Sequence, residues 1–129
     1  TLLTVAGDVT ITNTMLTVLV AASAFTSLTA ATQTITGTGE LFNNLDISEK
    51  KVASLLLYNG GAVTIPLSLQ ISPTTVSTDY MNDPDYGSFS LGSSQSTFVV
   101  IGNFAHYARL RYVMGTFNGT ITGYYQAQA

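Results

Sequence analysis

The residues of this chain that could carry acid-base chemistry gather around one histidine. His106 is the single histidine of the sequence, and it lies in the segment FAHYARLRY. A catalytic triad needs a histidine base, so His106 is the candidate for that role. The alternation around it predicts a β-strand, in which His106 shares a face with Ala108 and Leu110. We interpret His106 as a histidine that packs or hydrogen-bonds within a sheet, not as a general base.

Arg109 and Arg111 fall on the opposite face of the same predicted strand. A guanidinium group binds carboxylates and sulfate through charge-assisted hydrogen bonds, so both residues are candidates for an anion site. A carboxylate such as Asp46 or Glu49, contributed across a contact between subunits, is the partner that we favour. Arg109 and Arg111 are therefore predicted assembly residues.

A second polar group lies in the segment DYMNDPDYG, which contains Asp79, Asn82, Asp83 and Asp85. Hard oxygen ligands at this density could hold Ca²⁺, and Asp79, Asp83 and Asp85 are the candidate ligands. The spacing is not that of an EF-hand loop, which needs an ordered set of carboxylates and a glutamate at its twelfth position. Aspartate and asparagine also cap turns. We favour the turn interpretation and expect no obligatory metal.

Known catalytic motifs are absent from the sequence. It has no G-x-S-x-G, H-E-x-x-H, P-loop or dinucleotide-binding pattern. It also has no cysteine, which excludes disulfides and thiolate metal sites. We expect a protein that is not an enzyme and needs no cofactor.

The composition indicates which kinds of partner this chain can have. The 129 residues suit one domain, and only 9% of them are charged, against about a quarter in typical proteins. The net charge of −3, with four Lys and Arg residues, argues against nucleic acid and anionic membranes as partners. Residues 15–28 are too short and too rich in Thr and Ser to be inserted in a membrane. The surface is either kept soluble by hydroxyl groups or buried in an assembly, which we slightly favour.

The elements that position these residues are predicted to be strands. Residues 1–39 are rich in Thr, Val, Leu and Ala and carry one charge, Asp8. Val9, Ile11, Asn13 and Met15 alternate with threonines, the pattern extends to residue 20, and a further strand is predicted over 32–38. A helix is the competing interpretation for 16–24, but β-branched residues and missing caps favour strand. Residues 40–51 are predicted to form a solvated connection with one helical turn after Asp46.

Two Asn-Gly pairs predict two hairpins. Asn59-Gly60 would join strands over 52–58 and 62–71, and Asn118-Gly119 would join arms over 104–117 and 120–126. Pro66 in the second strand indicates a sheet edge or a bulge. Residues 72–87 read as a surface loop, and short strands are predicted over 88–91 and 97–101. The fold class is all-β, an antiparallel β-sandwich or jelly roll with an extended Thr/Val-rich N-terminal strand segment.

Seven tyrosines raise the possibility of carbohydrate binding, since flat aromatic rings stack on sugars. Five of them lie within predicted strands, where tyrosines more often pack against the sheet or its core. They are Tyr58, Tyr107, Tyr112, Tyr124 and Tyr125.

Three segments carry a resemblance to a known family. They are LLLYNGGAVTIPLSLQISP, FAHYARLRY and a closing YYQAQ, and the likeness spans about residues 46–128 together with the Thr-rich start. In these the chain resembles a family of small β-sandwich domains of unassigned function from spore-forming Firmicutes. The resemblance implies a surface or structural role, such as a spore or cell-surface filament. The chain is also similar in style to viral capsid decoration proteins.

We therefore expect a structural subunit that assembles with itself, located extracellularly or on a spore or virion surface. Residues 1–20 would form a strand segment that pairs with a neighbouring subunit, and 21–129 the β-sandwich domain. As a free edge this start would promote aggregation, because it lacks the Lys or Pro that protects edges. The alternatives are a capsid decoration protein and a monomeric carbohydrate- or surface-binding module, and the start could equally be an internal strand. The predicted assembly residues at the start are Leu2, Leu3, Val5, Val9 and Ile11.

Overall fold

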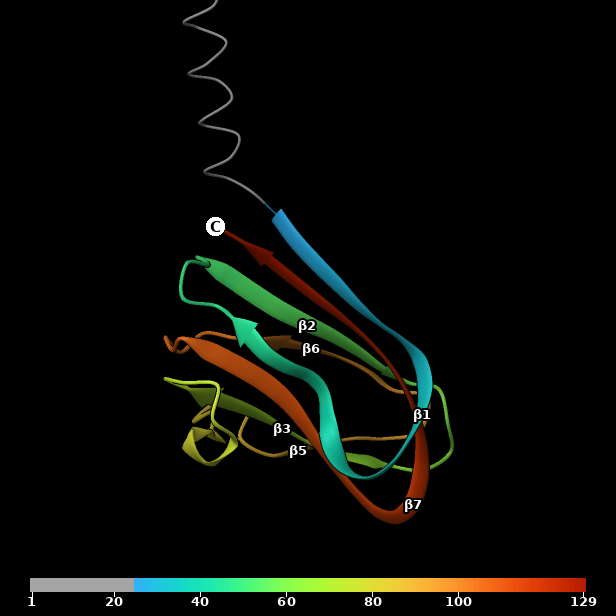
Figure 1. The fold of residues 1–129 in the computed structure, drawn as a ribbon. Coiled ribbons are helices and arrows are strands. Elements are labelled where there is room, and N and C mark those ends of the chain that lie inside the picture. The colour runs from blue at the N-terminus through green and yellow to red at the C-terminus, as the bar shows by residue number, and fades with distance from the viewer. Residues whose placement is uncertain (1–24) are drawn as a thin grey trace, which may run out of the picture.

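A computed structural model describes residues 25–129, which form seven antiparallel strands and one short 3-10 helix (Figure 1). Two of the strands, β1 and β7, are 22 residues long and lie side by side. The elements are β1 (Phe25–Asp46), β2 (Val52–Asn59), β3 (Ile65–Ser72), η1 (Ser77–Asp79), β4 (Met81–Asn82), β5 (Phe89–Leu91), β6 (Ser96–Val100) and β7 (Tyr107–Gln128).

The long strands belong to both halves of the sheet. The strand order is β4-β3-β7-β2-β6, with β1 also paired to β7 and β5 to β3. The first half of β7 pairs with β3 and its second half with β2, so the sheet folds over along β7. Gly37 in β1 and Gly115 in β7 lie at this fold and have φ angles of 68° and 63°. Glycine adopts this left-handed conformation without steric cost, which allows the two strands to bend together.

The two halves enclose one hydrophobic core. Alternate residues of each strand point inward, as the period of two requires. Val99 of β6 and Tyr125 of β7 contribute from one half, and Leu91 of β5 from the other. The side chains that are fully or almost fully buried in the middle are Leu55, Leu57, Ile65, Leu67, Leu69, Ala108, Leu110 and Ile121. The all-β sandwich expectation is confirmed.

The prediction of a turn at Asn118-Gly119 is wrong. Both residues lie inside β7, where Asn118 pairs with Thr36 and Gly119 with Ile35. The pair is a turn signal only when its two flanks can pair with each other, and here β1 pairs with the residues on both sides of it. The left-handed residue in this region is Gly115, three positions before Asn118.

The hairpin predicted at Asn59-Gly60 is also wrong, although β2 and β3 occur where strands were expected. The two strands do not pair, because β7 lies between them in the sheet. The connection after Asn59 instead crosses from one half of the sandwich to the other. Asn59 is fully buried, and its side chain donates to the carbonyls of Val63 (2.7 Å) and Leu91 (3.0 Å) and accepts from the Gly61 N–H (2.9 Å).

Three further expectations need correction or qualification. Residues 40–46 continue β1 and bury Phe42 and Leu45, so only 47–51 form the predicted connection, with a turn rather than a helix. The strand that carries Pro66 is not at an edge, since β3 lies between β7 and the pair β4 and β5. Pro66 itself pairs only with β5, before the pairing with β7 begins. The predicted segment 1–20 and its five assembly residues lie outside the described residues.

Candidate interaction surfaces

His106 lies immediately before β7, not within it, and its side chain is about half exposed (47%). Its Nε2 atom lies 3.5 Å from the carboxylate of Asp46, and its ring stacks on Tyr107 with centroids 4.1 Å apart. The nearby Ser48 hydroxyl donates to Asp46 (2.7 Å). In a catalytic triad the serine donates to the histidine, so this arrangement does not activate Ser48 as a nucleophile.

Asp46 is the titratable group that this cluster affects. The Ser48 hydroxyl and backbone N–H both donate to its carboxylate, and they lower the pKa of Asp46. His106 adds a smaller effect in the same direction. The cluster therefore holds an exposed carboxylate in its ionised form and fixes the turn at the end of β1.

Arg109 was expected to point outward, but the structure buries it with 4% of its surface exposed. Its face of β7 is covered by the segment around η1. The guanidinium donates to Gln70 (2.7 Å) and Ser77 (3.1 Å), and it lies 4.1 Å from the ring centroid of Tyr80. Burial raises the pKa of the Tyr80 hydroxyl, which the positive charge of Arg109 partly opposes. The Arg109 side chain thus connects β7 to β3 and η1 within one chain. A contact of Arg109 with another subunit would have to displace η1.

Arg111 lies in the middle of the sheet, paired with Glu40 of β1 and Ser68 of β3 in the strand register. It is half-buried. Among residues 25–129, the one basic side chain within 4 Å of a carboxylate is His106, beside Asp46, so no carboxylate of the described chain lies at this distance from Arg111. The expectation that an acid binds Arg111 across a subunit contact stays a prediction.

The acidic loop contains a turn built around Asp83, which is buried (2% exposed). One carboxylate oxygen of Asp83 accepts from the N–H groups of Asp85 (2.9 Å) and Tyr86 (3.0 Å), and the other accepts from Asn103 (2.8 Å). Asp79 instead accepts from Thr74. The described part of the chain has no group of three His, Cys, Asp or Glu side chains that could hold a metal ion. The turn-capping interpretation of Asp83 is confirmed.

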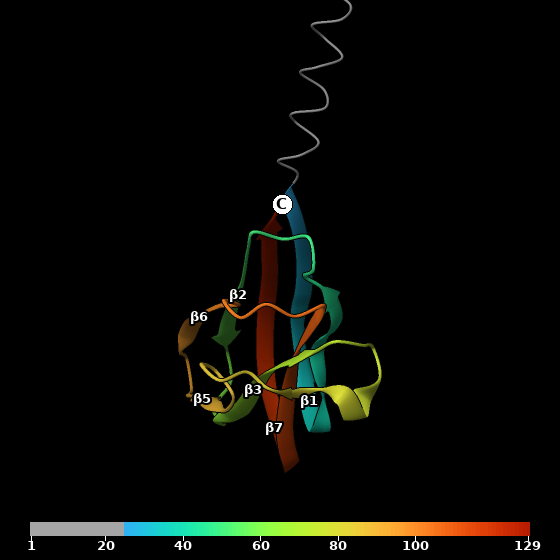
Figure 2. The same ribbon diagram turned by 90° about the vertical axis from the view of Figure 1, so that its left-hand side faces the viewer.

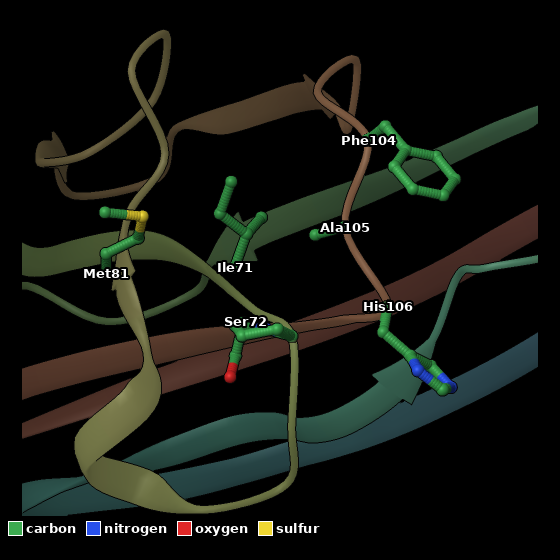
Figure 3. A pocket seen from close by; sticks show the side chains of 7 residues that line it. Ile71, Ser72, Met81, Phe104, Ala105 and His106 are labelled. Atoms are coloured by element: carbon green, nitrogen blue, oxygen red, sulfur yellow. The ribbon is translucent and has the colours of Figure 1, made fainter.

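A shallow groove of about 390 Å³ opens next to this loop (Figure 3). Ile71 of β3 lies at its centre, with Met81 of β4 on one side and Ala105 on the other. Phe104 and Met81 at its rim are 86% and 63% exposed. The groove is apolar apart from Ser72 and His106, so it suits an apolar group better than a polar substrate.

A larger apolar surface covers the outside of the half-sheet formed by β6, β2, the end of β7 and the start of β1. Leu56 of β2 lies opposite Phe98 of β6 and Tyr124 of β7, so these three side chains form one row across three strands. Val100 is the next outward residue after Phe98 on β6, and Val52 points outward at the start of β2. We call this surface the apolar outer face, and its exposed members are Phe25, Val52, Leu56, Tyr58, Phe98, Val100 and Tyr124.

The apolar outer face carries no charge. Strands β2 and β6, residues 121–128 of β7 and residues 25–36 of β1 contain no Asp, Glu, Lys or Arg. The other outward positions are Ser, Thr and Gln. Soluble monomers rarely expose a contiguous apolar surface of this kind, and its presence typically marks an interaction site. The expected location of the five strand tyrosines is confirmed, with Tyr58 and Tyr124 on this face and Tyr125 in the core.

The fold defines a small antiparallel β-sandwich domain with an exposed apolar sheet face. The chain belongs to the family described as a domain of unknown function (DUF6385), whose model matches residues 46–129. No match among curated protein sequences was found. Within residues 25–129, no helix is long and apolar enough to cross a membrane.

Solved structures with a similar fold include a protein described as exported and a protein described as prophage-derived. The PBSX exported protein XepA is 11% identical, with a TM-score of 0.57 over 81% of this chain and 37% of XepA. The SPBc2 prophage-derived protein YomS is 11% identical, with a TM-score of 0.55 over 82% of this chain and 94% of YomS. At these identities the likeness shows the fold alone. Bacillus endospore appendages, which form disulfide-linked pili, are 10% identical over 82% of this chain and 89% of theirs, and the TM-score of 0.47 is too low to establish a common fold.

Sequence reasoning missed the apolar outer face because β2 was assigned to a hairpin with β3 at Asn59-Gly60, whereas it pairs with β6 and β7. Phe98 and Val100 alternate with buried Val99, a signal that could have marked an outward apolar row on β6. The neighbours of that row, Leu56 and Tyr124, could not be found without knowing that β2 lies between β6 and β7.

Proposed function

We propose that this protein is a structural subunit that assembles with itself, and that the apolar outer face is buried in the assembly. The supporting observation is the face itself, where Phe98 is 56% exposed and Val52 likewise 56%. Each square ångström of apolar surface removed from water contributes about 25 cal/mol, so a face of seven large side chains gives a substantial driving force. Subunit interfaces that persist are enriched in such side chains and depleted in charge.

The sparse charge of the chain supports the same proposal. Only 9% of the residues are charged, and the outer face has none, so little opposes close approach of two copies there. We propose an extracellular or spore-surface filament as the assembly, with a capsid decoration protein as the alternative. The description of XepA as exported and of YomS as prophage-derived fits a location outside the cell or on a virion.

We also propose that the N-terminal segment, residues 1–20, pairs with a neighbouring subunit. The segment would contribute Leu2, Leu3, Val5, Val9 and Ile11 to the contact, and residues 21–129 would form the sandwich. The segment carries one charge, Asp8, and neither Lys nor Pro. A strand of this composition needs a partner for its backbone groups.

Sedimentation velocity and negative-stain microscopy of the full chain test the proposal. We expect species larger than the 13.6 kDa monomer, whose share grows with concentration. Phe98→Lys places a charge in the apolar outer face and should shift the distribution to monomers. Phe117→Lys is the matched control, because Phe117 is also exposed (66%) but lies outside this face. A wild-type protein that stays monomeric at high concentration would refute the proposal.

A carbohydrate-binding module is the second candidate, and one observation favours it. Tyr58, Phe98 and Tyr124 expose aromatic rings on one sheet face. Flat faces of this kind can stack against sugar rings. Sedimentation with insoluble polysaccharides distinguishes the two functions: a monomer that is retained by the polysaccharide, and released by Tyr124→Ala, would favour the binding module over the assembly.

A further inference from the structure

The sheet has several open edges, and most of them are protected against pairing with another strand. Strands β4 and β5, of two and three residues, are too short to accept a long partner. The pairing of β1 with β7 has four register shifts, and irregularities of this kind discourage addition of a strand. The start of β1, where the register is unbroken, is protected by a charged group, because the ammonium of Lys50 donates to the Thr26 hydroxyl (3.0 Å).

Strand β6 lacks all of these protections. It pairs with β2 in an unbroken register from Ser96 to Val100, and it contains neither charge nor proline. Among the described residues no strand pairs with its other edge. Figure 2 shows β6 at the margin of the molecule, beyond β2. A regular, β-branched and exposed edge of this kind is a template for strand addition.

We propose that the open edge of β6 is the acceptor for the N-terminal segment, residues 1–20, of a second copy of this chain, with residues 21–24 connecting the segment to Phe25. This inference rests on the proposed function and specifies the contact that builds the assembly. The added strand would continue the half-sheet, and its backbone groups would pair with those of β6. Its alternate side chains would lie beside Phe98 and Val100, extending the apolar outer face by one strand.

Length and position of the segment support this occupant. The segment joins the described chain at Phe25, in the strand β1 that forms the opposite margin of the same half-sheet from β6. Strands β7 and β2 lie between the two margins, a width of about 14 Å at the usual strand spacing. Twenty-four residues can extend over about 80 Å, which is more than enough to reach an adjacent molecule.

Charge and composition support it as well. The segment and β6 are both almost free of charge, with Asp8 as the exception, so neither repels the other. Threonines alternate with Val9, Ile11, Asn13 and Met15, the pattern of a strand with two different faces. Because the donor and the acceptor are different surfaces, the contact is head-to-tail and propagates into a filament or closes into a ring.

Disulfide trapping tests this assignment cleanly, because the natural chain has no cysteine. One full-length protein carries Ser96→Cys on β6, and three others carry Val9→Cys, Ile11→Cys or Asn13→Cys, because these side chains would lie on the same face as Ser96 and Phe98. The first is mixed with each of the others under oxidising conditions and analysed on non-reducing gels. Ser90→Cys, on the exposed edge strand β5, replaces Ser96→Cys as the matched control. Circular dichroism verifies that each variant is folded.

We expect a disulfide-linked heterodimer from Ser96→Cys with at least one of the three donors, at a yield at least fivefold above the Ser90→Cys control. Equal yields from both acceptors, or none, would overturn the assignment. A double variant such as Ile11→Cys with Ser96→Cys that forms only an internal disulfide would also overturn it, since the segment would then pair with its own chain. Sedimentation of the same mixtures separates the two proposals: assemblies without the Ser96 cross-link would refute this acceptor and leave the proposed function standing.

Discussion

At the scale of single residues, the most informative group is a buried hydroxyl without a partner. Tyr125 is 2% exposed, and its hydroxyl has no hydrogen-bond partner among the described residues. Burial raises the pKa of this hydroxyl, because the charged form would be poorly solvated. An unpaired buried polar group destabilises the folded state, so its removal should be favourable.

We therefore expect Tyr125→Phe to leave the free energy of unfolding unchanged or to raise it by up to about 1 kcal/mol. The ring contact with Phe42, at 6.4 Å between centroids, would be kept. Urea denaturation monitored by circular dichroism measures the change. A loss of stability greater than about 1 kcal/mol would show that the hydroxyl is hydrogen-bonded in solution.

Asn59 makes the opposite case, because both N–H donors and the carbonyl oxygen of its side chain form hydrogen bonds. Its amide joins Val63 and Leu91 and also accepts from Gly61, so truncation leaves buried backbone groups without partners. We expect Asn59→Ala to lower the free energy of unfolding by about 3 kcal/mol in urea denaturation. Asn118→Ala, on an exposed position of β7, is the control and should change it by less than about 0.5 kcal/mol. Equal effects of the two substitutions would contradict the role assigned to Asn59.

Asp46 should show a pH dependence whose sign follows from its lowered pKa. Because the folded state holds the pKa of Asp46 below its ordinary value, the ionised carboxylate stabilises the fold fully at pH values above that ordinary value. The contribution is lost as the pH falls through the lowered pKa. Titration of the carboxyl carbon by NMR should show that Ser48→Ala raises the pKa of Asp46 toward its ordinary value. His106→Gln should raise it less, and the reverse order would show that the histidine dominates.

At the scale of elements, the sequence predicts strands better than it predicts which strands pair. β2, β3, β5 and β6 lie close to their predicted ranges, because alternation of apolar and polar residues depends on local geometry alone. The two Asn-Gly pairs misled the prediction, since a turn depends on whether its flanks meet. The burial of Arg109 could not be predicted either, because η1, which covers it, is distant in the sequence.

The bend of the long strands gives a prediction for glycine. Gly115 has a φ of 63°, and a Cβ at this position would meet no atom within 4 Å. Only the backbone conformation therefore opposes a side chain there. We expect Gly115→Ala to lower the free energy of unfolding by about 1 kcal/mol, measured by thermal denaturation. Gly102→Ala is the control, because Gly102 has equally open surroundings without a positive φ, and a comparable loss in it would contradict the argument.

At the scale of the whole molecule, composition left two kinds of surface open, one kept soluble by hydroxyl groups and one buried between subunits. The structure has an exposed apolar face whose four strand segments carry no charge. The face arises only when β6, β2, β7 and β1 are brought together in this order. Its members come from sequence positions as far apart as Phe25 and Tyr124, so no local pattern could have revealed it.

An interface built on this face should respond to salt as an apolar contact does. Ion pairs between exposed groups weaken as the screening length falls from about 10 Å at 0.1 M salt to about 3 Å at 1 M. Apolar contacts do not weaken in this way, and sulfate strengthens them by its exclusion from the protein surface. We expect the sedimentation distribution to be unchanged between about 0.1 and 1 M sodium chloride, and to shift to larger species in ammonium sulfate.

The alternative is an assembly held by Arg111 and a carboxylate of a neighbouring subunit. It predicts dissociation over the same range of sodium chloride, and equal dissociation by Arg111→Gln at low salt. Phe98→Lys separates the two cases further, because it should abolish the apolar contact at every salt concentration, whereas an arginine contact elsewhere would survive it. Assemblies that dissolve in sodium chloride and tolerate Phe98→Lys would place the interface on the Arg111 surface and not on the apolar outer face.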